Sequence, residues 1–133
     1  MILGLAGQDD FESAYLDSIA DAQKDFYLEV EPYYCACGYG EGDKEKFHKD
    51  LFTPAAKRHL PIIEKMLKQS GYGFYAPGGL SWVDFFMAEQ THTFSGFDPE
   101  TYKQYPEILK HKERVYNLPQ LKDYIKSRKQ TPT

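Results

Sequence analysis

The sequence has little cysteine, a single tryptophan and no long hydrophobic run. Its 133 residues include two cysteines and one tryptophan, and no stretch of about 18 apolar residues occurs, so no membrane-spanning helix is expected. The opening MILGLAGQDD lacks the basic start and the apolar length of a secretory signal peptide, so we expect a cytoplasmic protein. A net charge of −4 gives no electrostatic reason to expect a nucleic acid or a membrane as partner.

Cysteine and histidine are too sparse to predict a metal site. Cys35 and Cys37 are separated by one residue, whereas a structural zinc site needs four ligands. The histidines show no ligand spacing; they are His48, His59, His92 and His111. We therefore predict no bound metal and two reduced thiols, as is usual in the cytosol.

Familiar catalytic motifs are also absent. The sequence has no glycine-rich phosphate loop, no nucleophile elbow and no His-Glu-x-x-His motif. Aromatic residues, in contrast, are abundant, with 11 tyrosines and 9 phenylalanines. That many rings can form a core, a ligand pocket, or both.

Apolar residues recur at steps of three and four through most of the chain, which predicts helices. The first helix is expected from Asp9 or Asp10 to about Tyr34, with a break over CACGYGEGDKEK. Later starts are expected at Thr53-Pro54, Ser81, Asp98-Pro99, Tyr105-Pro106 and Asn117-Leu118-Pro119, with Pro61 bending or restarting the second helix. No strand pattern is convincing, so we predict an all-α bundle of about five helices.

The stretch GGLSWVDFFMAE places an aspartate inside an apolar run. Ser81 and Asp84 have the spacing of a capping box, in which each side chain accepts a hydrogen bond from the other residue's backbone N–H. Leu80 and Phe85 fall at the two positions of a hydrophobic staple. We predict that these four residues serve folding, as a buried helix start.

The order of these segments resembles the C-terminal helical domain of glutathione S-transferases. The resemblance rests on the first acidic helix, the Thr-Pro helix, GGLSWVDFFMAE, and FDPETYKQYPEILKHKERVYNLPQLKDYIKSR. It extends from about Leu5 to Arg128 and is closest to the sigma class, which includes glutathione-dependent prostaglandin D synthases. It implies a linker remnant at residues 1–7, the helical domain at 8–128 and a tail at 129–133.

The resemblance also implies that a thioredoxin-like N-terminal domain, which activates the glutathione thiol, is missing from this chain. Whether the chain alone is an enzyme is therefore left open. The complete protein is expected to conjugate glutathione, its co-substrate, to small hydrophobic electrophiles in detoxification, or to isomerise a prostaglandin-like substrate. A homodimer is expected as well, with part of its interface on the first helix.

Four positions carry the family's site residues over to this sequence. Asp25 matches an aspartate that reaches the glutathione amino group bound in the neighbouring subunit, a charge-assisted pairing. Its neighbour Lys24 departs from the acid often found there. The family's electrophile pocket, which the tail would close, is lined by rings that match Tyr27, Phe86 and Tyr33. If the register shifts by one residue, Tyr34 takes the place of Tyr33. Plain core packing explains such rings equally well.

Two further functions remain open from the sequence. The helical domain can act alone as a non-catalytic binding or assembly module, with apolar rings exposed toward a partner. It can also be a small helical carrier for an apolar ligand, which needs only the aromatic pocket.

Overall fold

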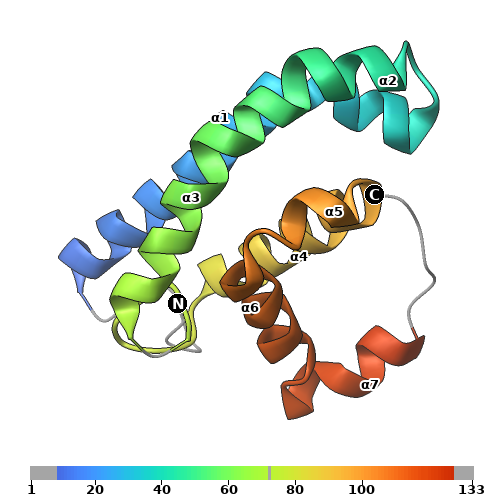
Figure 1. Ribbon diagram of the computed structural model, residues 1–133. Coiled ribbons are helices and arrows are strands. Elements are labelled where there is room, and N and C mark those ends of the chain that lie inside the picture. The colour runs from blue at the N-terminus through green and yellow to red at the C-terminus, as the bar shows by residue number, and fades with distance from the viewer. Residues whose placement is uncertain (1–8, 72, 128–133) are drawn as a thin grey trace.

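The structure, a computed structural model, describes residues 9–71 and 73–127, and these fold into a helical bundle (Figure 1). The linker expected at 1–7 and the tail expected at 129–133 lie outside the described residues. The elements are α1 Asp10–Tyr39, α2 Lys44–Phe47, η1 His48–Phe52, α3 Thr53–Ser70, α4 Trp82–Phe97, α5 Pro99–Tyr102, α6 Pro106–Tyr116 and α7 Pro119–Ser127. The all-α prediction is thus confirmed, with the longer helices α1, α3, α4, α6 and α7 matching the predicted five.

Helix α1 is longer than the sequence predicted. It begins as expected after Asp9, whose carboxylate accepts a hydrogen bond from the Glu12 N–H at 2.8 Å. It ends at Tyr39, not near Tyr34. The stop is Gly40, which takes a left-handed conformation with φ of 71° and donates its N–H to the Ala36 carbonyl. Within the expected break, Gly38 is still helical, and the helix stops only at Gly40.

Helix α3 begins at Thr53 with Pro54 in its first turn, as predicted, but Thr53 does not cap it, because the chain is already helical before it. The π-helix η1 runs directly into α3, and no side chain caps α3 at its start. Pro54 has no N–H to donate to the preceding turn, which is compatible with the wider π turn beside it. Pro61 does not restart the helix, since α3 is continuous to Ser70 and Pro61 lies on its exposed side.

Three phenylalanines from distant segments form the centre of the core. Phe26 of α1, Phe52 of η1 and Phe94 of α4 are all fully buried. Their ring centroids lie 5.4 to 6.0 Å apart, a favourable range for aromatic packing. Helix α1 packs against both α3 and α4 in this region, and α4 packs on its far side against α6 (Figure 1).

The start of α4 is buried and hydrogen-bonded. Ser81 is its N-cap, and both halves of the capping box with Asp84 are present. The Asp84 carboxylate accepts hydrogen bonds from the backbone N–H groups of Ser81 at 2.8 Å and Tyr75 at 2.9 Å. Leu80 and Phe85, at the staple positions, are half-buried.

Candidate functional site

Asp25 lies on an exposed acidic face of α1. Asp17, Asp21 and Asp25 recur at four-residue steps, and all three are exposed. Lys24 beside Asp25 is exposed too. The position leaves the Asp25 carboxylate accessible to a ligand or to another subunit.

A cluster of tyrosines occupies a different face of α1; we call Tyr27, Tyr34 and Tyr39 the tyrosine cluster. The rings of Tyr27 and Tyr34 meet edge to face at 5.3 Å, and Tyr39 lies 6.3 Å from Tyr34. Tyr34 also reaches Phe94 and Phe97 of α4, both at 6.0 Å. The cluster therefore extends the aromatic core to the surface, where Tyr39 is 61% exposed.

The hydroxyl of Tyr27 is a potential hydrogen-bond donor to a ligand. Partial burial raises the pKa of Tyr27, and nearby Glu31, Cys35 and Tyr39 raise it further. A protonated phenol can donate a hydrogen bond, so Tyr27 offers both an apolar ring and a donor to a ligand.

Phe86 lies on α4, along the contact between α4 and α1. Its ring is half-buried and 6.5 Å from the Trp82 ring. Gln90, one turn further along α4, accepts a hydrogen bond from the Gln23 side chain of α1 at 3.4 Å. Tyr27 in turn lies one turn beyond Gln23. Tyr27 and Phe86 thus flank this amide pair from opposite directions, and no ring contact joins them.

Tyr33 lies apart from the tyrosine cluster. It is only 2% exposed, and its ring packs against Phe52 at 4.7 Å and His48 at 5.5 Å. Burial, followed by a hydrogen bond with Cys37, raises the pKa of Tyr33. Of the two register alternatives, Tyr34 shares a face with Tyr27, whereas Tyr33 lines a separate cavity.

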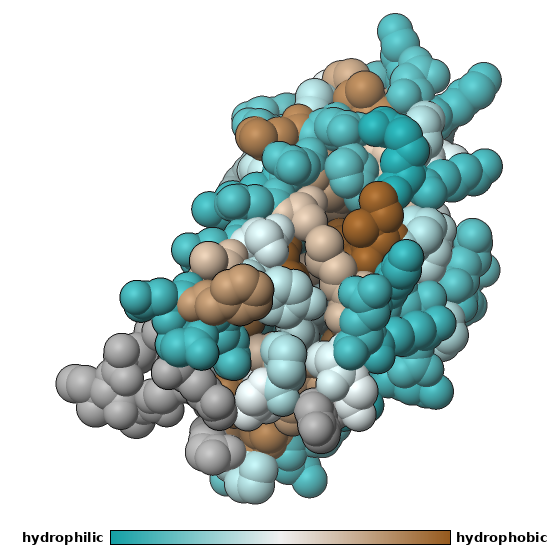
Figure 2. All heavy atoms as spheres, turned by 90° about the vertical axis from the view of Figure 1, so that its left-hand side faces the viewer, coloured by the Kyte–Doolittle hydropathy of each residue, from teal (hydrophilic) through white to brown (hydrophobic). Residues whose placement is uncertain are grey.

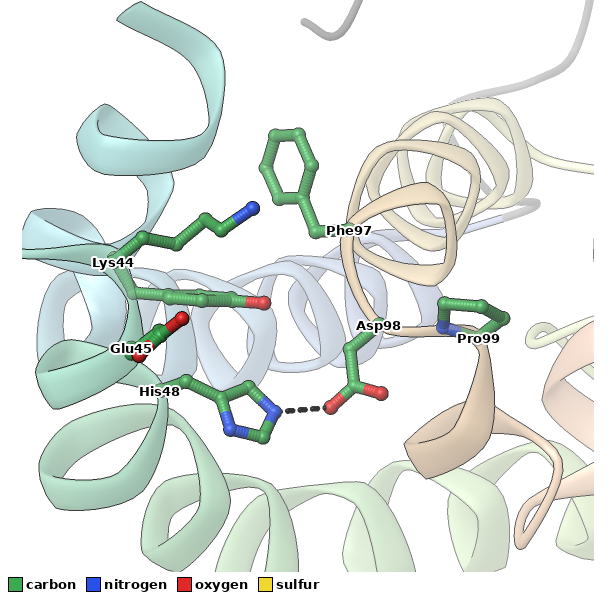
Figure 3. Close-up of a pocket in the computed structure, with 7 residues that line it drawn as sticks. Lys44, Glu45, His48, Phe97, Asp98 and Pro99 are labelled. Atoms are coloured by element: carbon green, nitrogen blue, oxygen red, sulfur yellow. Dashed lines mark hydrogen bonds and ion pairs between the residues drawn. The ribbon is translucent and has the colours of Figure 1, made fainter. Parts of the chain in front are cut away.

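That separate cavity, which we call the outer cavity, lies between the end of α1, the α2–η1 segment and the α4–α5 junction (Figure 3). Its volume is about 270 Å³. Figure 3 shows Lys44 reaching toward Phe97 on one side and His48 facing Asp98 on the other. The lining residues are Tyr33, Lys44, Glu45, His48, Phe97, Asp98 and Pro99.

A short hydrogen bond crosses the outer cavity. His48 Nε2 lies 2.6 Å from Asp98 Oδ2, although the two residues are 50 positions apart. Thr101 donates to the same carboxylate through its N–H at 3.1 Å and its hydroxyl at 2.6 Å. Burial raises the pKa of Asp98, but these bonds from Thr101 and His48 outweigh it and lower the pKa overall.

Two histidines for which the sequence indicated no role are joined to aspartates in the structure. His48 pairs with Asp98, and His111 pairs with Asp84 at 2.8 Å. Each pair spans more than 25 residues, so no local spacing could have indicated it. The only available signal was that Asp84 lies in an apolar run and needs hydrogen-bond donors.

Two observations concern other kinds of site. Within residues 9–71 and 73–127, no group of three or more His, Cys, Asp or Glu side chains could hold a metal ion. In the same ranges, no helix combines the length and apolar character needed to cross a membrane.

Comparison with known protein families and relatives shows which proteins this chain is similar to. A family profile described as "Glutathione S-transferase, C-terminal domain" matches residues 29–128. The chain is 35% identical over 130 residues to Glutathione S-transferase 1 of Ascaris suum, covering 97% of this chain and 63% of that relative. The chain thus spans less than two thirds of the length of this curated relative.

Solved structures show the same arrangement. A Nu-class GST from Haemonchus contortus is 36% identical, with a TM-score of 0.83 over 98% of this chain and 63% of that one. Rat hPGDS, solved with a quinoline, has a TM-score of 0.81 over 98% of this chain and 63% of that one. Its identity is 22%, so it shows the shared fold alone.

Proposed function

The chain belongs to the glutathione S-transferase family, as its C-terminal helical domain, and we propose that the complete protein conjugates glutathione to small hydrophobic electrophiles. In that reaction the glutathione thiolate attacks an electrophilic carbon, a C–S bond forms, and a leaving group departs or the product takes up a proton. We assign to residues 8–128 the electrophile side of the site and part of a homodimer interface. The setting proposed is cytoplasmic detoxification.

The tyrosine cluster is the observation that carries this proposal. An electrophile pocket needs apolar walls with a few polar groups that fix orientation. Tyr27 and Tyr34 supply ring surface continuous with the core through Phe94, and the protonated Tyr27 hydroxyl supplies a donor. Phe86 adds a second apolar surface on α4, beyond the Gln23–Gln90 amide pair. We propose Tyr27, Tyr34 and Phe86 as the pocket residues, with Tyr33 supporting them from the core.

Asp25 is proposed as the contact to the glutathione amino group. Its carboxylate is exposed, and pairing with an ammonium would be a charge-assisted hydrogen bond. Because the contact is to a molecule bound in the neighbouring subunit, it also makes dimerisation part of the proposal. Lys24 weakens the local negative potential.

The transferase class and the chemical nature of the electrophile are further parts of this proposal. We place the protein near the sigma class, where isomerisation of a prostaglandin-like substrate is an alternative reaction. The similar Haemonchus contortus structure is described as Nu-class. A panel of substrates, with product analysis for isomerised and conjugated products, distinguishes these chemistries.

The test uses the full-length product of the open reading frame that encodes this chain. Consumption of glutathione thiol is followed with a chloronitrobenzene as electrophile. We expect turnover, and a raised KM for the electrophile when Tyr27 is replaced by alanine. The matched control is Leu28→Ala, because Leu28 is 65% exposed on another side of α1. Absence of turnover in a folded full-length protein, or equal effects of both variants, would refute the proposal.

A second function is favoured by exposed apolar side chains. Phe11 is 85% exposed and Ile62 is 53% exposed, and Figure 2 shows apolar patches within a largely hydrophilic face. Such surface is compatible with a non-catalytic binding or assembly module. Calorimetric titration of glutathione into the chain of 133 residues bears on this choice. Binding supports a site in this domain, whereas its absence together with stable self-association favours the assembly module.

A further inference from the structure

The outer cavity has a floor of polar groups that are already paired. The Asp98 carboxylate, 9% exposed, accepts hydrogen bonds from His48 and from the N–H and hydroxyl of Thr101. Two elements that are distant in sequence, η1 and α5, are thereby fixed relative to each other. The floor is therefore preorganised, and a ligand is not needed to hold it together.

The rim, in contrast, carries two opposite charges without partners. Lys44 and Glu45 are consecutive and both exposed. Among the residues that the structure describes, neither Lys44 nor Glu45 takes part in an ion pair, although Lys44 is close enough to the Cys37 thiol to act on it electrostatically. Figure 3 shows that both side chains border the cavity and that Lys44 reaches toward the Phe97 ring. A ligand with one positive and one negative group would complement this rim.

The remaining walls are apolar and the space is small. Tyr33 and Phe97 contribute rings, which approach each other edge to face at 6.2 Å. The volume of about 270 Å³ lies just below the range of about 300–1,000 Å³ that is usual for drug-sized ligands. We propose that the outer cavity binds a small zwitterion with a flat apolar body, of the chemical class of an aromatic α-amino acid. Its carboxylate pairs with Lys44, its ammonium with Glu45, and its ring packs on Phe97.

The outer cavity shares the Phe97 ring with the tyrosine cluster, since Tyr34 lies 6.0 Å from it, but the proposed amino-acid binding does not depend on the proposed transferase function. The test is calorimetric titration of L-phenylalanine into the folded chain, with NMR of the His48 ring to locate binding. Phenylpropionate, which lacks the ammonium, and phenethylamine, which lacks the carboxylate, are titrated in parallel. We expect phenylalanine to bind more tightly than either analogue, and the His48 signals to shift.

Charge-neutral variants then assign the two ends of the ligand. Lys44→Gln is expected to weaken phenylalanine binding roughly tenfold, the typical loss for one charge-assisted hydrogen bond. Glu45→Gln is expected to weaken phenylalanine similarly but to leave phenylpropionate unchanged. Lys46→Gln is the matched control, since Lys46 is exposed on the same helix but does not line the cavity.

Four results would overturn the proposal. They are the absence of phenylalanine binding by the folded chain, phenylpropionate binding as tightly as phenylalanine, equal losses in Lys44→Gln and Lys46→Gln, and binding that leaves the His48 signals unmoved. Because both lining residues are exposed and unpaired, their variants should fold normally, which circular dichroism verifies.

Discussion

His111 Nε2 lies 2.8 Å from Asp84 Oδ1, and both side chains are completely inaccessible to solvent. This bond joins α6 to the first turn of α4. Asp84 also accepts the backbone N–H groups of Ser81 and Tyr75, so one carboxylate fixes three segments. A buried carboxylate is costly unless it is fully hydrogen-bonded, and here three N–H groups meet that requirement.

Replacing Asp84 by asparagine should destabilise the fold strongly. An amide has only one oxygen, so it cannot accept all three donors, and its own NH₂ group would face an N–H. We expect a loss of about 2–4 kcal/mol in the free energy of unfolding, as for other buried polar groups left unpaired. Urea denaturation monitored by circular dichroism measures this.

Asp17→Asn serves as the control for that experiment. Asp17 is exposed on α1, and the substitution removes the same charge without breaking a buried network. We expect a change within about 0.5 kcal/mol, as is usual for surface positions. If the two variants lost equal stability, the capping-box role of Asp84 would be wrong.

The coupling between His111 and Asp84 can be measured directly. His111→Leu keeps the site filled but removes a donor from Asp84, and we expect a cost of about 1–3 kcal/mol. The double variant with Asp84→Asn should lose less than the sum of the single losses, because the shared bond is removed once. A coupling of about 1–2 kcal/mol is expected from a double-mutant cycle. Strict additivity would show that the bond contributes nothing to stability.

The sequence predicted those parts of the fold that depend on neighbours along the chain. Asp9 is four or fewer residues from every group that it caps, and the Ser81–Asp84 unit is equally local. The end of α1 was misplaced because the three glycines after Cys37 left several stops open. Only the packed structure selects Gly40, where the Ala36 carbonyl is available.

Much of the candidate site could not be predicted, because it depends on how the helices pack against one another. Tyr33 and Tyr34 are adjacent, and a shift of about 100° around the helix decides which one faces the core. The Thr53-Pro54 pattern located the start of α3 but gave no sign of the π-helix before it, since proline in a first turn is equally compatible with a preceding helix. Pairings such as His48 with Asp98 depend on how distant helices meet, and periodicity carries no information about that.

Glu29 provides a test by pH. Hydrogen bonds from Arg58, at 3.1 and 2.6 Å, and from His59, at 2.9 Å, lower the pKa of Glu29 from 4.5 to about 2. Because the folded pKa is below the unfolded one, the stabilisation is complete above pH 4.5 and is lost as the pH falls toward 2. Glu29 is 38% exposed, so solvent screening limits the effect to under about 1 kcal/mol.

The measurement compares the wild type with Glu29→Gln across this pH range. The wild type should be more stable above pH 4.5, and the two unfolding curves should converge near pH 2. Asp21→Asn, which changes an exposed acid on the same helix, should show no such convergence. A difference between wild type and Glu29→Gln that does not depend on pH would contradict the pairing.

The adjacent tyrosines Tyr33 and Tyr34 should separate stability from binding. Tyr33 is 2% exposed and packs against Phe52, so Tyr33→Ala should cost about 3–5 kcal/mol, as for other large core truncations. Tyr34 is only half-buried, so Tyr34→Ala should cost less stability but weaken binding of an apolar ligand to the tyrosine cluster. Urea denaturation measures the first effect, and titration of an apolar dye measures the second. Should Tyr34→Ala bind the dye as well as the wild type does, the pocket must lie elsewhere, and the electrophile site assigned to α1 would have to be abandoned.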